Sequence, residues 1–276
     1  MNKRLLTIQD VSCVGQCSLT VALPVISACG IETAILPSAV LSTHTGGFKH
    51  FTFRDLTDEL PVIEAGWQKE GIQFDAFYTG YVCAGQIDPI LSIMKTCALP
   101  GAIRIVDPAM ADNGLLYKGF GNDFPMLMKK LCVGADYVIP NLTEAAFLLG
   151  RKPVLEGYDK AFIREIAEGL YAIGSRNVIL TGVSFSKNEL GIATFDGKEM
   201  QYYFNERQTQ SSHGTGDLYA SVFCGAIMRG WDMLSAASLA ADIVVAAIQA
   251  TTSDHWYGVC FEQVMPLLVQ RLSAGK

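Results

Sequence analysis

The stretch with the clearest chemical potential is His213-Gly214-Thr215-Gly216-Asp217, which places two glycines and a carboxylate directly before an apolar helical pattern. Glycine lets the backbone turn sharply and approach a ligand closely, and the first N–H groups of a helix lack intrahelical acceptors. Such a turn can bind an anion such as a phosphate group. Because a carboxylate there would repel a stably bound phosphate, Asp217 is better suited to act as a base that takes a proton from an attacking hydroxyl.

The same turn also has a purely structural interpretation. Gly214 and Gly216 would then form an ordinary loop, and Asp217 would complement the dipole of the helix that follows. The turn alone supports both interpretations equally, so the elements that position it have to decide between them.

The composition indicates one globular domain over residues 1–276. Half of the residues are hydrophobic and the mean hydropathy is +0.27, which is enough for a large core. The sequence shows no Pro/Gly/Ser-rich linker, charge run or repeat that would divide it. The formal net charge of −6 argues against a nucleic-acid or anionic-membrane partner, since both require clustered Lys and Arg. The apolar surplus leaves room for a buried subunit interface, so we expect a homodimer.

Cysteine usage and hydropathy predict a cytoplasmic protein. The eight cysteines are scattered without the C-x2-C pairs of a zinc site, and they are expected to be reduced thiols. The N-terminal apolar run meets Gln9 and Asp10 before a signal-peptide core is complete. The most apolar later segment, 236–250, is too short to span a bilayer and carries Asp242 and Gln249, so we expect a core helix.

Short β-type runs alternate with helical patterns along the chain, and this alternation predicts right-handed crossovers and a parallel sheet. The expected strands cover residues 5–8, 33–36, 76–78, 103–106, 137–139 and 178–180. The expected helices cover 19–29, 55–70, 89–97, 124–133 and 160–173, and three further helices end the chain. Residues 191–195 and 200–204 form an antiparallel hairpin about the turn Asp196-Gly197. We therefore expect a doubly wound α/β fold with a mostly parallel central sheet, helices on both faces and one short antiparallel hairpin.

Polar residues follow the expected strands in turn. In an open α/β sheet, ligands bind beyond the carboxyl ends of the strands. Each residue also has a local explanation: Asn141 can cap a helix, Glu144 can complete its capping box, and Tyr81 can sit at a sheet rim. Their joint occurrence before the turn at 213–217 is harder to explain locally. The segments concerned are Asp10 with Ser12, 42–47, 79–81, Asp107-Pro108, 140–144 and Thr181-Gly182.

These segments together resemble the pyridoxal kinases of the ribokinase-like superfamily, in the right order and over nearly the whole chain. The motifs that carry the resemblance are Ile8-Gln9, Ser42-Thr43-His44-Thr45-Gly46, Thr79-Gly80-Tyr81, Asp107-Pro108, Pro140-Asn141-Leu142-Thr143-Glu144 and Gly214-Thr215-Gly216-Asp217. G-T-G-D alone is weakly specific, but together with T-G-Y and H-T-G it indicates vitamin B6 kinases rather than sugar kinases.

The resemblance implies a role for each matching residue. Asp217 would be the base for the 5′-hydroxyl, and Gly214, Thr215 and Gly216 would form the anion hole. Further implied roles fall into three sets: Asp107 and Glu144 for Mg²⁺ and its waters; Asp112, Asn141, Thr181, His213 and Gly214 for ATP; and His44, Thr45, Tyr81 and either Asp10 or Ser12 for the pyridine ring. Ile139 stands where relatives often carry a Thr near a monovalent cation such as K⁺.

Other functions stay open on the sequence alone. A hydroxymethylpyrimidine kinase shares the expected fold and the G-T-G turn, although related dual-substrate enzymes often carry Cys where Asp217 stands. A sugar kinase and a non-catalytic vitamin- or nucleotide-binding module are further alternatives, and loss of the base would indicate the latter. The sequence has neither the P-loop pattern G-x4-G-K-S/T nor a G-x-G-x-x-G after the first strand, which argues against P-loop nucleotide binding and dinucleotide oxidoreductases.

Overall fold

The computed structural model describes residues 3–210 and 212–275, and the chain divides into two compact units. The first unit combines residues 1–102 and 208–276, and the second comprises 103–207. The first unit holds the residues expected to bind the ring and act as base, and the second holds most of those expected for metal and nucleotide. Compact units are not by themselves independent domains, so the single kinase domain stays a prediction.

The sheet of the first unit is mostly parallel and has the strand order β4-β1-β2-β3. Strand β1 (Arg4–Ser12) pairs in parallel with β2 (Glu32–Leu41) on one side and with β4 (Phe74–Thr79) on the other. The short β3 (Phe53–Asp55) pairs antiparallel with β2 at the edge. Successive residues of β1, including Leu5 and Leu6, are fully buried, as in parallel strands covered on both faces.

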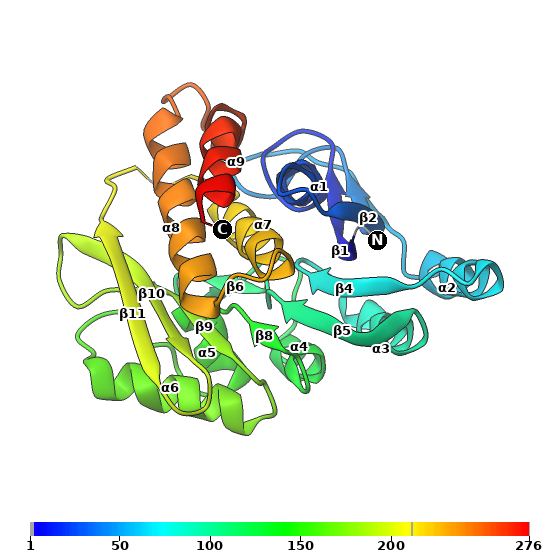
Figure 1. The fold of residues 1–276 in the computed structure, drawn as a ribbon, viewed down its shortest axis with the longest axis horizontal. Coiled ribbons are helices and arrows are strands. Elements are labelled where there is room, and N and C mark those ends of the chain that lie inside the picture. Colours follow the sequence, from blue (N-terminus) through cyan, green and yellow to red (C-terminus); the bar gives the residue numbers. More distant parts are fainter. Residues whose placement is uncertain (1–2, 211, 276) are drawn as a thin grey trace. The chain divides into compact units, whose positions relative to one another are not determined.

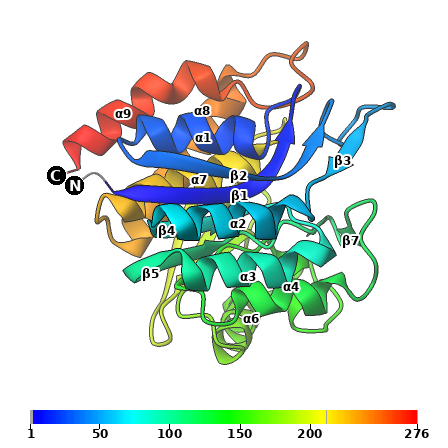
Figure 2. The ribbon, with the colours of Figure 1, turned by 90° about the vertical axis from the view of Figure 1, so that its right-hand side faces the viewer.

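Helices of the first unit pack on this sheet and on one another. Figure 2 shows α1 running alongside β1 and β2, and Figure 1 shows the last three long helices side by side. Helix α7 packs between α1 and α8, so the turn that begins α7 is held by a buried helix. The helices of this unit are α1 (Leu19–Ala28), α2 (Glu59–Glu70), α3 (Ile87–Thr96), α7 (Thr215–Met228), α8 (Met233–Ala250) and α9 (Met265–Ala274), with short 3-10 helices at Ala84–Gln86 and Phe261–Val264.

Helix α8 corrects one expectation. It begins at Met233 rather than at residue 236, because Asp232 caps it by accepting the N–H of Ser235 at 3.0 Å. Its 18 residues have a mean hydropathy of 1.7, which is long and apolar enough to cross a membrane by length and composition. The prediction that this apolar segment is too short to span a bilayer was therefore wrong. Its packing against α7 and α9 and its buried residues, such as Ile243, still favour a core helix.

The second unit contains parallel strands followed by an antiparallel hairpin. Strand β8 pairs in parallel with β5 and β9, and β10 pairs antiparallel with β9 and β11. Helix α6 lies against β9 and β10, and α4 packs on α5. Its elements are the last four residues of β5 (Ala98–Val106), followed by β6 (Ala111–Asp112), β7 (Leu115–Leu116), α4 (Phe124–Cys132), β8 (Tyr137–Val138), α5 (Leu142–Leu148), α6 (Lys160–Ala172), β9 (Val178–Val183), β10 (Glu189–Phe195) and β11 (Met200–Glu206).

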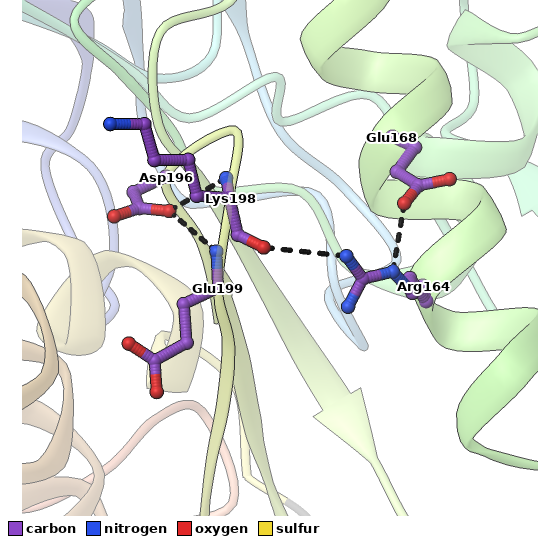
Figure 3. A network of polar contacts seen from close by, with 5 residues as sticks. All are labelled: Arg164, Glu168, Asp196, Lys198 and Glu199. Carbon is purple, nitrogen blue, oxygen red and sulfur yellow. Dashed lines mark hydrogen bonds and ion pairs between the residues drawn. The ribbon is translucent and has the colours of Figure 1, made fainter.

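The expected turn at Asp196-Gly197 joins β10 to β11. Asp196 accepts the backbone N–H groups of Lys198 and Glu199 at 2.9 and 2.8 Å, and Gly197 has a φ of +91°. Arg164 of α6 donates to the Lys198 carbonyl at 3.3 Å, which ties the helix to the turn (Figure 3). The mostly parallel α/β sheet and its antiparallel hairpin confirm the expected fold class.

Two local expectations differ from the structure. Helix α2 starts at Glu59 instead of residue 55, because Asp55 belongs to β3 and accepts the N–H of Thr57 at 2.6 Å, which turns the chain before the helix. The short strands β3, β6 and β7 were not expected, since runs of two or three residues carry little periodicity, whereas the start of α5 was expected from the capping box of Asn141 and Glu144.

Candidate active site

Gly214 and Gly216, at the start of α7, are glycines for two different physical reasons. Gly214 takes a φ of +78°, and a Cβ there would lie 1.6 Å from the backbone oxygen of Gln16. Gly216 is different: among the described residues, no heavy atom outside its own helix and chain neighbours lies within 4 Å of a Cβ built there. Packing therefore requires Gly214, while Gly216 leaves open space over the first N–H groups of the helix.

Asp217 lies in the first turn of α7 beside this open space. The pKa of its carboxyl is raised to about 7: burial is the largest cause, a hydrogen bond from the backbone N–H of Ser18 opposes the rise, and the nearby charge of Asp10 adds to it. A carboxyl with a pKa near the working pH can accept a proton and release it again. The geometry thus fits the predicted general base.

Asp10 lies two residues before the end of β1 as a buried carboxylate held by two serines. Its oxygens accept the hydroxyl of Ser18 at 2.5 Å and that of Ser12 at 2.8 Å. Burial raises the pKa of Asp10, while these hydrogen bonds act in the opposite direction. Because the Ser12 proton points at Asp10, the Ser12 oxygen can serve a ligand as a hydrogen-bond acceptor.

Ser18 is a residue that sequence reasoning missed. It stands at the N-cap of α1, but its side chain makes no capping bond and its backbone adopts φ 55° and ψ −134°. Positive φ is uncommon for a residue with a Cβ and costs free energy. A Ser before an apolar helix is a capping signal, so the sequence marked the position without indicating that its hydroxyl serves Asp10 instead. The partly buried thiol of Cys17 is next to the same two carboxyls, and burial raises its pKa.

His44 fixes the loop after β2 through both of its ring nitrogens. Nδ1 accepts the N–H of Gly46 at 3.0 Å, so the proton resides on Nε2, which donates to the carbonyl of Tyr257 at 2.7 Å. Burial lowers the pKa of His44, in agreement with this neutral form. The ring can therefore contact a substrate through its face or edge, while its nitrogens serve the protein.

Aromatic rings connect this loop to two distant segments. The His44 ring lies 5.1 Å from that of His213 and 5.0 Å from that of Phe48, which in turn lies 4.7 Å from Trp256. A Cβ on Gly46 would meet His213 at 2.7 Å, so the loops pack closely. Phe48 and Trp256 carry no motif and were not expected at the site.

Tyr81 follows β4 and is half-buried near Asp10. Burial raises the pKa of its phenol, and the charges of Cys83, Asp10 and Asp55 raise it further. The structure thus brings Asp10, Ser12, His44, Tyr81, His213 and Asp217 into the first unit, with Thr45 exposed on the same loop as His44.

In the second unit, Asn141 and Glu144 form the expected capping box of α5. The Asn141 side chain accepts the N–H groups of Thr143 and Glu144 at 2.8 and 2.9 Å and donates to the carbonyl of Ala111 at 2.8 Å. The Glu144 carboxylate accepts backbone N–H groups of Asn141 at 2.9 Å and Met110 at 3.1 Å. Burial nevertheless raises the pKa of Glu144 to about 8. Both residues therefore shape the local backbone, whatever ligand they bind.

The remaining predicted residues of this unit surround the capping box. Asp112 acts on Glu144 by its charge, Thr181 pairs with Asn141, and Asp107 and Glu144 both act on the buried thiol of Cys132. Within residues 3–210 and 212–275, no three His, Cys, Asp or Glu side chains are arranged as a metal site. Mg²⁺ is commonly bound by one or two carboxylates with waters and substrate phosphates, so the buried Asp107 and the neighbouring Glu144 fit this ion.

A family model described as phosphomethylpyrimidine kinase matches residues 26–259 of the chain. The chain is 26% identical over 253 residues to the thiamine biosynthetic bifunctional enzyme TH1 of Arabidopsis thaliana chloroplasts. This match covers 86% of the chain but 47% of that enzyme, so the chain spans about half of its relative's length.

Two solved structures resemble the chain over nearly its full length. The first is a candidate phosphomethylpyrimidine kinase of Bacteroides thetaiotaomicron in a crystal form with pyridoxal, at 32% identity and a TM-score of 0.91, covering 97% of this chain and 96% of that one. The second is the pyridoxal kinase of Lactobacillus plantarum, at 29% identity and a TM-score of 0.90, covering 99% of each chain.

Proposed function

Because the chain belongs to the phosphomethylpyrimidine kinase family, we propose that it transfers the terminal phosphoryl group of ATP to a hydroxymethyl group on a nitrogen-containing aromatic ring. The preferred substrates are the B6 vitamers pyridoxal, pyridoxamine and pyridoxine, and the product is the 5′-phosphate. The observation that carries this proposal is the half-buried Asp217, whose pKa is raised to about 7 chiefly by desolvation, at a helix N-terminus with open space at Gly216.

The chemistry follows from the first unit. Asp217 takes the proton of the hydroxymethyl group as its oxygen attacks phosphorus, and the bond from phosphorus to the leaving oxygen of ADP breaks. The N–H groups at the start of α7 bind the transferring phosphoryl oxygens, because they have no acceptor within the helix. Gly216 permits the close approach that this contact requires.

Mg²⁺, when bound, neutralises charge on the phosphate oxygens. Asp107 would hold the ion and Glu144 would orient its waters, since the carboxylate of Glu144 already accepts backbone N–H groups. Asp112, Asn141 and Thr181 are the proposed nucleotide contacts of the second unit, and His213 of the first.

Two observations support B6 vitamers over hydroxymethylpyrimidine. The base position holds Asp217 rather than Cys, and the Bacteroides relative was crystallised with pyridoxal. Tyr81 can stack on the substrate ring, and the serines held by Asp10 can accept hydrogen bonds from it. Hydroxymethylpyrimidine kinase is the second candidate, favoured by the matching family model and by the thiamine enzyme of Arabidopsis.

The test is a product assay. Purified protein is incubated with Mg·ATP and, separately, pyridoxal, pyridoxamine, pyridoxine and hydroxymethylpyrimidine, and each mixture is analysed by mass spectrometry. The proposal expects a gain of one phosphate on the B6 vitamers. Phosphorylation of hydroxymethylpyrimidine alone would favour the second candidate, and no phosphorylation of any compound would reject kinase activity on this substrate class.

A further inference from the structure

We propose that Ser18 is a positioning residue that links Asp10 to the base Asp217, so that a cationic group of the substrate beside Asp10 enables Asp217 to accept a proton. The inference rests on the proposed function, because it assigns to Asp217 the role of base. It adds a specificity determinant: the charge of the substrate ring or its amine controls the reactivity of the base.

Ser18 joins the two carboxylates by direct hydrogen bonds. Ser18 donates its hydroxyl to Asp10 at 2.5 Å and its backbone N–H to Asp217, so one residue contacts both carboxylates. It does so from a backbone conformation with φ 55° and without capping α1, although a Ser in this position ordinarily caps its helix. Positive φ in a residue other than glycine persists where surrounding contacts enforce it, and such strain gathers at functional sites.

The two carboxylates also influence one another by their charges. Asp10 is buried and Asp217 is half-buried, and nearby like charges with little access to water disfavour double ionisation. The charge of Asp10 accordingly raises the pKa of Asp217, after the larger effect of burial. The titratable groups found around the pair are the neutral His44, the thiols of Cys17 and Cys83, and the phenol of Tyr81.

A cationic substrate would complete this arrangement. Ser12 and Ser18 donate their hydroxyl protons to Asp10, so their oxygens keep lone pairs that can accept a hydrogen bond from a protonated ring nitrogen or an ammonium group. A positive charge there offsets Asp10 and favours the ionised, proton-accepting form of Asp217. By thermodynamic linkage, ionisation of Asp217 in turn tightens the binding of the cation.

The experiment measures the base directly and needs no turnover. The carboxyl carbons of aspartate are labelled with ¹³C, Asp217 is assigned from the spectrum of Asp217→Asn, and its titration is followed in the full-length protein. In Asp10→Asn we expect Asp217 to titrate about 1 pH unit lower than in the wild type, the size usual for removal of a nearby like charge. Unchanged titration of Asp217 in Asp10→Asn would overturn the proposal.

Two ligands and two variants test the link itself. Pyridoxamine, which carries a protonated amine, should lower the titration midpoint of Asp217 in the wild type, whereas the matched alcohol pyridoxine should lower it less. Ser18→Ala removes the hydroxyl, and Ser18→Gly also adopts positive φ without strain, so at least one variant should fold. Both should lose half or more of the pyridoxamine-induced shift. Equal shifts with the two ligands, no shift, or full shifts in both variants would overturn the proposal.

Ser92→Ala is the matched control, because Ser92 also donates its hydroxyl to a buried carboxylate, that of Glu64, at 2.8 Å, but lies on α3 outside the site. It should leave the Asp217 titration and its response to pyridoxamine unchanged. Failure of the proposed kinase function would appear separately as absence of phosphorylated product, whereas failure of the link would appear in the titrations.

Discussion

Asp217→Asn should lower activity and raise stability, and the stability gain should depend on pH. Burial raises the pKa of Asp217 from 3.8 to about 7 in the folded protein. A raised pKa contributes stability that is present below pH 3.8 and is lost as the pH rises through 7. Each pKa unit corresponds to about 1.4 kcal/mol, so about 2–3 kcal/mol is lost between pH 5 and pH 8. Asn carries no charge and avoids this loss.

Urea unfolding at pH 5 and pH 8 measures this difference. The stability of Asp217→Asn relative to the wild type should increase between the two pH values by about 2–3 kcal/mol, while kcat falls by roughly 10²–10⁴-fold and the KM for ATP changes little. The exposed Glu70→Gln serves as control and should show no such pH dependence. A variant with near wild-type turnover, or one whose relative stability is the same at both pH values, would refute the reasoning.

Four further predictions concern individual residues. Gly214→Ala should prevent stable folding, because its Cβ would collide with the Gln16 carbonyl. Gly216→Ala should keep or raise the melting temperature yet lower kcat. Similar melting temperatures and similar kcat losses in the two variants would contradict the structural role of Gly214 and the functional role of Gly216. Tyr81→Ala should raise the KM for the B6 substrate far more than that for ATP, measured by steady-state kinetics, and an equal rise in both would reject ring stacking. Asp107→Ala should weaken activity at low Mg²⁺ with partial rescue at high Mg²⁺, and an unchanged Mg²⁺ dependence would reject the metal role. Glu144→Ala should show the same Mg²⁺ effect and also destabilise the fold by about 1–3 kcal/mol in urea unfolding, since buried N–H groups lose their acceptor; unchanged stability would reject that structural role.

Features encoded within a few residues could be predicted from the sequence. The capping box of Asn141 and Glu144 and the turn at Asp196-Gly197 each depend on neighbours in the chain, and both are present in the structure. The order of strands and helices followed equally from local periodicity. The positions of the site residues at strand ends followed from the general behaviour of parallel sheets.

Features that depend on distant contacts could not be predicted. Asp10 and Ser18 are joined by a side-chain bond that ignores the local capping rule, and the nitrogens of His44 are used by Gly46 and by Tyr257, which is 213 residues away. Helix α8 began earlier than hydropathy indicated, because its cap is a polar residue that the apolar pattern does not include. In each case the partner is chosen by tertiary packing.

The central claim is a preference for B6 vitamers, and a competition assay tests it most directly. Pyridoxal and hydroxymethylpyrimidine are mixed at equal concentration with limiting Mg·ATP, and the two phosphorylated products are quantified by mass spectrometry as the ratio of their kcat/KM values. We predict an excess of pyridoxal 5′-phosphate of at least about tenfold, which corresponds to about 1.4 kcal/mol of transition-state discrimination. A ratio near one, or an excess of phosphorylated hydroxymethylpyrimidine, would contradict the account.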